Sequence, residues 1–288
     1  MEATRGLEFC LEFRPFGNFR QRKNAMINIQ KYVQAESLEE AYQLNQKRSA
    51  RILGGMLWLK LGRGTVGTAI DLGRLGLDAI EETEDRFSLG AMTTLRQLEL
   101  HPGLNAYTQG AAAAAVRDIV GVQFRNMATV GGSVWGRFGF SDVLTLLLAL
   151  DTEVELYQGG LVPLEEFASR KPDNDILVRV HIRKTPGAVA YTAMRIQRTD
   201  FPVLTCALSR MDGEYRAVIG ARPGRAMRLR DEKGLLREGI HEESARAFGD
   251  WAAEQVPTGT NVRGSAAYRT HLVRVLTRRA ALELGGLL

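Results

Sequence analysis

Two adjacent glycines, Gly131 and Gly132, are the first residues of this chain whose position points to chemistry. They lie in "RNMATVGGSVWGRFGFSD" at 125–142, where an extended run gives way to a helical pattern. Glycine has no Cβ, so successive backbone N–H groups can converge on an anion, and the N-terminus of a following helix adds positive potential. The pair indicates either contact with a phosphate-bearing ligand or an ordinary tight turn.

Two more loops, "LGGMLW" at 53–58 and "LGAMTT" at 89–94, also carry glycine where a strand is expected to end. None of the three loops contains GxGxxG or GxxxxGK[ST], so a Rossmann dinucleotide site and a P-loop are not indicated. Because three such loops occur in one alternating segment, they favour a phosphate-bearing ligand over unrelated turns. The residues alone take this inference no further than a nucleotide-like ligand.

Metal centres and acid–base chemistry are not indicated. The two cysteines, Cys10 and Cys206, form no CxxC pair and are too few for the four thiolates that an iron–sulfur cluster usually needs. The four histidines share no metal-ligand spacing. No acid–base pair or nucleophile triad is evident, so we expect no metal site and no catalytic side chain in this sequence.

The composition, 45% hydrophobic and 25% charged over 288 residues, is that of a soluble globular protein with one large or two ordinary domains. The net charge is +5, but the basic residues are scattered without interleaved aromatics, so nucleic-acid binding is not expected. The longest apolar run, 143–150, is too short to cross a membrane, and residues 1–25 lack the apolar core of a signal peptide. We expect a cytoplasmic protein without membrane contact.

Strands and helices alternate in the first half of the chain. The capping box of Ser37 and Glu40 predicts the start of a helix, and "RILGG" and "FSLGA" are expected to be short strands that end in tight turns. A further helix follows Thr94, which Gln97 would help to cap. The alanine-rich segment 110–119 favours a helix, "SDVLTLLLALD" a buried helix and "TEVELY" a strand.

The pattern changes near 169–175, and we expect a domain boundary there. "ILVRVHIR" at 176–183 alternates between apolar and polar residues, as a half-buried strand does. The Asp212-Gly213 pair between two apolar runs predicts a β-hairpin, and two helices follow it. The second half is therefore expected to be an antiparallel sheet with helices packed on it.

The stretch 125–151 resembles the FAD-binding (medium) subunit of the xanthine dehydrogenase and carbon monoxide dehydrogenase family of molybdenum hydroxylases. That family carries Arg-Asn-x-Ala-Thr-x-Gly-Gly-Asn, then Ser-Asp and a leucine-rich helix, as "RNMATVGGSV" and "SDVLTLLLAL" do here. "LGGMLW" falls where the family has Ala-Gly-Gly-Thr-Asp-Leu, "LGAMTT" where it has Gly-Ala-x-Thr, and "VRGSAAYRTHLVRVL" matches its C-terminal helix. Met56, Leu57 and Ser133 depart from the pattern, so the resemblance implies that side-chain hydrogen bonds to the ligand are lost there while bonds from backbone N–H groups remain.

The resemblance implies an α+β fold: a two-lobed FAD-binding domain of the molybdopterin dehydrogenase flavoprotein type, followed by an antiparallel sheet with helices. On this basis residues 26–168 are the FAD-binding domain and 169–288 the C-terminal antiparallel α+β domain. Residues 1–25 would be an N-terminal extension before a second start at Met26, and not necessarily structured.

The resemblance also implies FAD as the cofactor, with its pyrophosphate held by main-chain amides of both glycine pairs. Thr129 and Ser133 would donate hydroxyl hydrogen bonds, and Asp142 would accept from the ribityl or ribose hydroxyls. Alternatively, Ser141 or Asp142 caps the following helix. The expected FAD-binding residues are Ile52, Leu53, Gly54, Gly55, Met56, Leu57, Trp58, Thr93, Thr129, Gly131, Gly132, Ser133, Asp142 and Leu177.

Several of these residues keep a second interpretation. Trp58 and Leu177 either contact the cofactor or are ordinary core residues. Arg125 is expected to brace its loop rather than touch the ligand. Tyr191 and Arg195, which precede "TDFPV", are expected to line the face of the flavin ring.

The function implied by the resemblance is electron transfer in a xanthine dehydrogenase-like complex. A molybdenum-cofactor subunit would oxidise the substrate, and a [2Fe-2S] subunit would relay the electrons to FAD. The flavin would pass them to NAD or another acceptor. Two alternatives stay open: a flavin-free assembly subunit of the same fold, suggested by "GGMLW", and a stand-alone FAD oxidase.

Overall fold

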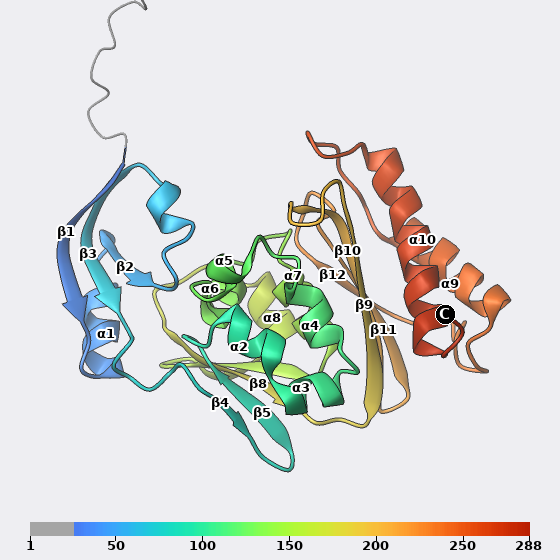
Figure 1. The fold of residues 1–288 in the computed structure, drawn as a ribbon, viewed down its shortest axis with the longest axis horizontal. Coiled ribbons are helices and arrows are strands. Elements are labelled where there is room, and N and C mark those ends of the chain that lie inside the picture. Colours follow the sequence, from blue (N-terminus) through green and yellow to red (C-terminus); the bar gives the residue numbers. More distant parts are fainter. Residues whose placement is uncertain (1–25) are drawn as a thin grey trace, which may run out of the picture.

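Three β-sheets with helices between and beside them make up the part of the chain that the computed structural model describes, Met26 to Leu288. The expected N-terminal extension, 1–25, and Cys10 lie outside the described residues. Figure 1 shows the three-stranded sheet at one end of the molecule and the four-stranded sheet with its two long helices at the other. This arrangement confirms the expected α+β class.

The three-stranded sheet has the order β1 (Ile27–Gln34), β3 (Gly64–Asp71), β2 (Ala50–Leu53), and both pairs are parallel. Helix α1 (Leu38–Asn45) crosses from β1 to β2, and its N-cap Ser37 accepts a hydrogen bond from the N–H of Glu40, as predicted. Strand β2 leads into the loop 54–58 and a turn of 3-10 helix, η1 (Leu59–Leu61).

The central sheet is five-stranded and antiparallel. Its order is β4 (Ile80–Glu82), β5 (Arg86–Gly90), β8 (Leu177–Arg183), β6 (Thr152–Leu156), β7 (Gly160–Pro163). One face belongs to the largest apolar core of the described residues, to which it contributes Phe87, Val154 and Val180. The short helices of residues 95–169 pack against this face of the sheet (Figure 1).

The short helices lie between the central and four-stranded sheets (Figure 1). They are α2 (Leu95–Leu100), α3 (Pro102–Tyr107), α4 (Ala111–Val116), α5 (Val122–Arg125), α6 (Val130–Trp135), α7 (Asp142–Ala149) and α8 (Leu164–Ser169). The capping box of Thr94 and Gln97 at the start of α2 is formed as predicted. Helix α7 is buried at every residue, because it packs against α4 and α6 and also against the four-stranded sheet.

The four-stranded antiparallel sheet has the order β12 (Met227–Arg230), β11 (Glu214–Gly220), β10 (Pro202–Met211), β9 (Gly187–Arg195). The hairpin between β10 and β11 turns at Asp212 (φ 49°) and Gly213 (φ 80°), the two positive φ angles that such a turn requires. Helices α9 (Glu242–Gln255) and α10 (Ala266–Leu284) pack with this sheet around a second apolar core.

The strand 177–183 lies in a different sheet from the one expected. It pairs with β5 and β6, because Val180 and Ile182 pack into the core of the central sheet, and it makes no pairing with β9. The expectation that the second sheet takes up this strand is therefore wrong. We propose that the boundary lies between β8 and β9, and we refer to residues 26–183 as the first lobe and 187–288 as the second.

Within residues 26–288, no helix is both long enough and apolar enough to cross a membrane. Over the same residues, no group of three or more His, Cys, Asp or Glu side chains is arranged to hold a metal ion.

Candidate functional site

The loops 54–58 and 126–133 are in direct contact, and glycine makes this contact possible. A Cβ on Gly55 would lie 1.7 Å from the carbonyl oxygen of Met127, which no side chain could tolerate. A Cβ on Gly54 would lie 3.0 Å from Thr129 Oγ1 and 3.7 Å from the Cα of Gly132. The carboxyl end of β2 and the N-terminus of α6 therefore form one continuous surface.

The third glycine loop packs against the same place from the other side. A Cβ on Gly131 would lie 2.5 Å from the carbonyl oxygen of Ala91. The backbone at Ala91, and not a ligand, therefore excludes a side chain at Gly131. Gly132 is different: it is exposed, and its Cβ would meet only Thr129 Oγ1, at 3.0 Å. Of the two glycines, only Gly132 faces open space.

The N-terminus of α6 has its amides engaged within the chain. The N–H of Gly131 donates to the carbonyl of Ala91 at 2.9 Å, and the N–H of Gly132 donates to Thr129 Oγ1 at 3.1 Å. The N–H of Ser133 donates to the carbonyl of Thr129 at 3.1 Å. These amides, which the sequence assigned to a pyrophosphate, are already satisfied by Ala91 and by the N-cap Thr129.

The loop 54–58 differs from the N-terminus of α6, because its backbone N–H groups are unpaired in the described part of the chain. None of its backbone N–H groups donates to an acceptor within residues 26–288. Met56 has a left-handed backbone (φ 57°), which turns the chain sharply in the middle of the loop. A run of unpaired N–H groups at a turn of this kind is suited to an anion. The free amides of the site are thus on "GGMLW", not on the opening glycine pair.

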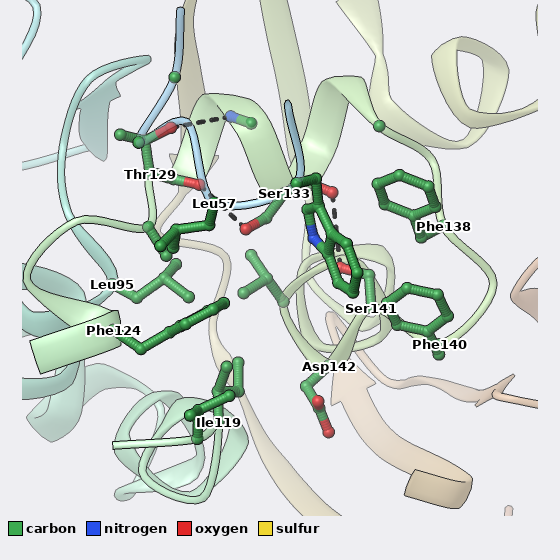
Figure 2. Close-up of a pocket in the computed structure, with 18 of the residues that line it drawn as sticks. Leu57, Leu95, Ile119, Phe124, Thr129, Ser133, Phe138, Phe140, Ser141 and Asp142 are labelled. Atoms are coloured by element: carbon green, nitrogen blue, oxygen red, sulfur yellow. Dashed lines mark hydrogen bonds between the residues drawn. The ribbon is translucent and has the colours of Figure 1, made fainter. Parts of the chain in front are cut away.

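A cavity of about 340 Å³ lies along this loop. Figure 2 shows Leu57, Leu95, Ile119 and Phe124 gathered at one side of it. Four aromatic rings that also line the cavity pack together with ring centroids 4.8 to 5.8 Å apart. They are Trp58, Phe138, Phe140 and Phe201. The cavity is therefore suited to a flat, apolar or aromatic group.

A second cavity, of about 370 Å³, adjoins the first. Both are lined by Gly54, Thr129 and Gly132, so the two cavities share part of their wall at the contact between the loops. The second cavity also has a polar side, formed by Asn45, Arg51, Asp173, Asn174 and Asp175. The lining of the second cavity is therefore more polar than that of the first.

All but one of the residues expected to bind the cofactor line one of these cavities. Gly55, Met56, Leu57, Trp58, Ser133 and Asp142 line the first, and Leu53, Gly131 and Leu177 line the second. Ile52, Gly54, Thr129 and Gly132 line both. Thr93 lines neither: it is fully buried, and its hydroxyl donates to the carbonyl of Ala79 at 3.0 Å.

Sequence reasoning missed the aromatic residues that the loop 136–141 and the second lobe bring to the first cavity. Phe138 and Phe140 stand two apart just before Ser141, in "RFGFSD", and this spacing was the available signal. Phe201 reaches the cavity from the second lobe, and no local pattern marks it. Arg125 braces its loop as expected: its Nε donates to Glu99 Oε2 at 2.8 Å, and it lines neither cavity.

Asp142 is a buried carboxylate at the edge of the first cavity (Figure 2). The N-cap of α7 is Ser141, whose hydroxyl accepts from the N–H of Leu144, so Asp142 is not the cap. Its Oδ1 accepts hydrogen bonds from the Tyr191 hydroxyl and from Arg195 Nη2, each at 2.5 Å. Burial raises the pKa of Asp142 to about 6, although Arg195 and Tyr191 act in the opposite direction.

Family models match almost the whole described chain. One, described as the FAD binding domain in molybdopterin dehydrogenase, matches residues 25–184, and another, described as the CO dehydrogenase flavoprotein C-terminal domain, matches residues 189–284. The chain belongs to the flavoprotein subunits of the molybdenum hydroxylase family. Its cofactor is FAD. The limits of the two matches also support a boundary between β8 and β9.

Two similar proteins are named as a medium subunit and a medium chain, and each is matched over nearly its whole length. The chain is 28% identical over 278 residues to the nicotine 6-hydroxylase medium subunit of Paenarthrobacter nicotinovorans, covering 88% of this chain and 97% of that one. It is 24% identical over 276 residues to the glyceraldehyde dehydrogenase medium chain of Sulfolobus acidocaldarius, with 88% and 97% covered. The carbon monoxide dehydrogenase of Hydrogenophaga pseudoflava has the same fold: TM-score 0.79, 24% identity, 89% of this chain and 96% of that chain covered.

The different surroundings of the two opening glycines predict different effects of alanine. Gly131→Ala is expected to lower the free energy of unfolding by about 1–3 kcal/mol, because Ala91 must move. Gly132→Ala is expected to cost much less, since its new methyl group has open space on all sides except that of Thr129. Urea unfolding of both variants measures the difference. Equal losses would contradict the packing described here.

The raised pKa of Asp142 predicts how the effect of Asp142→Asn depends on pH. The native state holds this proton more tightly than the unfolded chain, so the contribution of Asp142 to stability falls as pH rises from about 4 through about 6. Asparagine does not titrate. The destabilisation of the variant relative to wild type should therefore shrink by up to about 3 kcal/mol between pH 4 and 7. Unfolding at a series of pH values tests this. A difference that grows with pH would show that Arg195 outweighs burial and holds the pKa of Asp142 below its ordinary value.

Proposed function

We propose that this flavoprotein subunit carries electrons within a molybdenum hydroxylase complex, from an iron–sulfur subunit through FAD to NAD or another acceptor. The observation that supports this most is the loop 54–58, whose backbone N–H groups have no acceptor within residues 26–288 and whose residues line the first cavity beside the second. FAD has the matching form, with a negatively charged pyrophosphate between two ring systems.

The residues present fit such a cofactor. The N–H groups of Gly54 to Trp58 would hold the pyrophosphate, in place of the amides of Gly131 and Gly132. The Thr129 hydroxyl accepts from the N–H of Gly132 and has no acceptor for its own proton within residues 26–288, so it can donate to the ligand. The Ser133 hydroxyl already donates to the Thr129 carbonyl at 2.9 Å and would act as an acceptor.

When bound, FAD supplies the electron-carrying chemistry, and the protein supplies binding, orientation and electrostatics. Trp58, Phe138 and Phe140 give the first cavity an aromatic wall, against which a flat group could pack. Asp142 can accept from a ligand hydroxyl through Oδ2, which accepts no hydrogen bond from residues 26–288.

The proposed partners follow from the similar proteins. The relatives are named as medium subunits, or, in 6-hydroxypseudooxynicotine dehydrogenase of Paenarthrobacter nicotinovorans, as subunit alpha of a complex. We infer that a molybdenum-cofactor subunit and a [2Fe-2S] subunit accompany this chain, and that the molybdenum subunit selects the substrate. Stable complexes of this kind typically bury on the order of 1,200–2,000 Å² per interface.

The flavin-free alternative rested on Met56 and Leu57, which replace side chains that bind the cofactor in the family. In this structure the free ligand groups of that loop are main-chain N–H groups, which no side-chain replacement removes. The loop is thus competent to bind the cofactor that the family identifies.

Purified protein is expected to release FAD, not FMN, on denaturation, and Gly132→Val should abolish this. The valine methyl groups would occupy the open space beside Gly132, a residue that lines both cavities. We expect at least a hundredfold weaker FAD binding with an almost unchanged circular dichroism spectrum. Gly121→Val is the matched control, because Gly121 has an extended backbone, lies outside both cavities and would meet only the Gln123 side chain, at 3.4 Å. Equal FAD binding by both variants would misplace the site.

Electron transfer is tested by stopped-flow spectroscopy of the FAD-loaded chain. A heterocyclic or aldehyde substrate should leave the flavin absorbance of the isolated chain unchanged. Bleaching should appear only when the molybdenum and iron–sulfur subunits are added, and NADH should reduce the isolated chain slowly. If a substrate bleaches the isolated chain directly, the protein is the stand-alone oxidase.

A further inference from the structure

The second lobe reaches the first cavity through one short segment. The loop 196–201 joins β9 to β10, and its residues Thr199, Asp200 and Phe201 line the cavity together with Arg195. All the other residues that line this cavity, apart from Pro202, come from the first lobe. The position of this loop therefore decides how far the cavity is closed on the side of the second lobe.

Arg195 ties this loop to the first lobe. Its Nη2 donates to Asp142 Oδ1 at 2.5 Å, and its Nη1 donates to the carbonyl of Asp200 at 2.6 Å. The side chains of Arg195 and Asp142 are 9% and 6% exposed. One guanidinium thus joins the start of α7 in the first lobe to the end of the loop in the second. Since removal of one partner leaves a buried charge without compensation, such a link is costly to break.

The residue next to Asp200 extends the link to the amide loop. The N–H of Phe201 donates to Asp200 Oδ1 at 2.7 Å, so the two residues are held together. The Phe201 ring packs against Trp58 with centroids 5.7 Å apart and against Phe140 at 4.8 Å. Trp58 belongs to the loop 54–58, which lines the cavity and whose backbone N–H groups have no acceptor within residues 26–288. The chain of contacts therefore runs from Asp142 through Arg195 and Phe201 to the proposed phosphate site.

We propose that Arg195 is a positioning residue that holds the loop 196–201 closed over the first cavity and so slows the release of FAD. This inference rests on the proposed function, because it takes FAD to be the occupant. Arg195 also fixes the Asp142 carboxylate through Oδ1, which leaves Oδ2 for a ligand hydroxyl. The second lobe acts here by retaining a ligand that the first lobe binds.

The loop carries a matched control. Arg198 lies in the same loop and also forms an ion pair with the first lobe, from its Nε to Asp118 Oδ1 at 2.9 Å. Its side chain is 81% exposed, and exposed pairs contribute little. Arg198→Gln and Arg195→Gln therefore remove the same charge from the same loop, but only the second removes a buried link.

Two measurements on the full chain test the proposal. The first is the dissociation rate of FAD, followed by the rise of free flavin fluorescence after dilution. The second is hydrogen exchange of the peptide that covers 196–202, in FAD-free protein. Arg195→Gln should raise both rates at least tenfold, and Arg198→Gln should change them less than twofold. Arg195→Lys should restore part of the retention, because the charge opposite Asp142 returns while the link to Asp200 is lost.

The double variant D142N/R195Q covers the case in which Arg195→Gln fails to fold, since it leaves no unpaired buried charge. It should fold, exchange rapidly over 196–202 and lose FAD at least tenfold faster. The proposal is overturned if the double variant exchanges hydrogen over 196–202 and releases FAD at the same rates as the wild-type protein. It is also overturned if the double variant exchanges rapidly but releases FAD at the wild-type rate. If the wild-type protein takes up no FAD, the proposed function fails. Slow hydrogen exchange over 196–202 that persists in the double variant separately excludes the role of Arg195 in holding the loop.

Discussion

The architecture of the site depends on the close approach of three backbone segments in the first lobe. Gly55 lies against the Met127 carbonyl and Gly131 against the Ala91 carbonyl, at distances that leave no space for a Cβ. This packing brings the end of β2, the end of β5 and the start of α6 to one point. It also consumes the amides of α6 and leaves those of 54–58 free. The close packing of the chain on itself therefore decides which main-chain N–H groups stay unpaired within residues 26–288.

Helix α7 connects this point to the rest of the molecule. Its apolar side chains pack into the largest core, and Thr145 on the same helix shares a hydrogen bond of 2.9 Å with Thr205 of β10. The Asp142 carboxylate at its N-terminus meets Tyr191 and Arg195 of β9. One buried helix of the first lobe thus also packs against the second lobe, and side chains of the second lobe orient the Asp142 carboxylate at the edge of the first cavity.

Local sequence signals predicted the elements well. The cap at Ser37, the capping box at Thr94, the Asp212-Gly213 hairpin and the buried helix after Ser141 each depend on residues a few positions apart, and all are confirmed. The sheet to which residues 177–183 belong was not predictable in this way. Strand alternation shows that one face is buried, but not which strands lie beside it.

The family resemblance predicted many of the residues that line the two cavities, and physical reasoning from the sequence predicted fewer of them. The glycine pair at 131–132 suggested that a ligand approaches both residues, whereas Ala91 approaches one of them. Thr93 has the right place in the sequence, but its hydroxyl serves the carbonyl of Ala79. Phe201 reaches the cavity only because the lobes pack together, and such long-range packing leaves no periodic trace in the sequence.

If the loop 54–58 binds the cofactor through its main-chain N–H groups, as we propose, this has a consequence for how the subunit can evolve. Every amino acid except proline carries the same N–H group, so the side chains at Met56 and Leu57 can drift without removing the donors. The length of the loop cannot drift in the same way, because one inserted or deleted residue would change the direction of each N–H that follows. Related subunits should therefore differ in the amino acids between β2 and η1 but keep the same number of residues there.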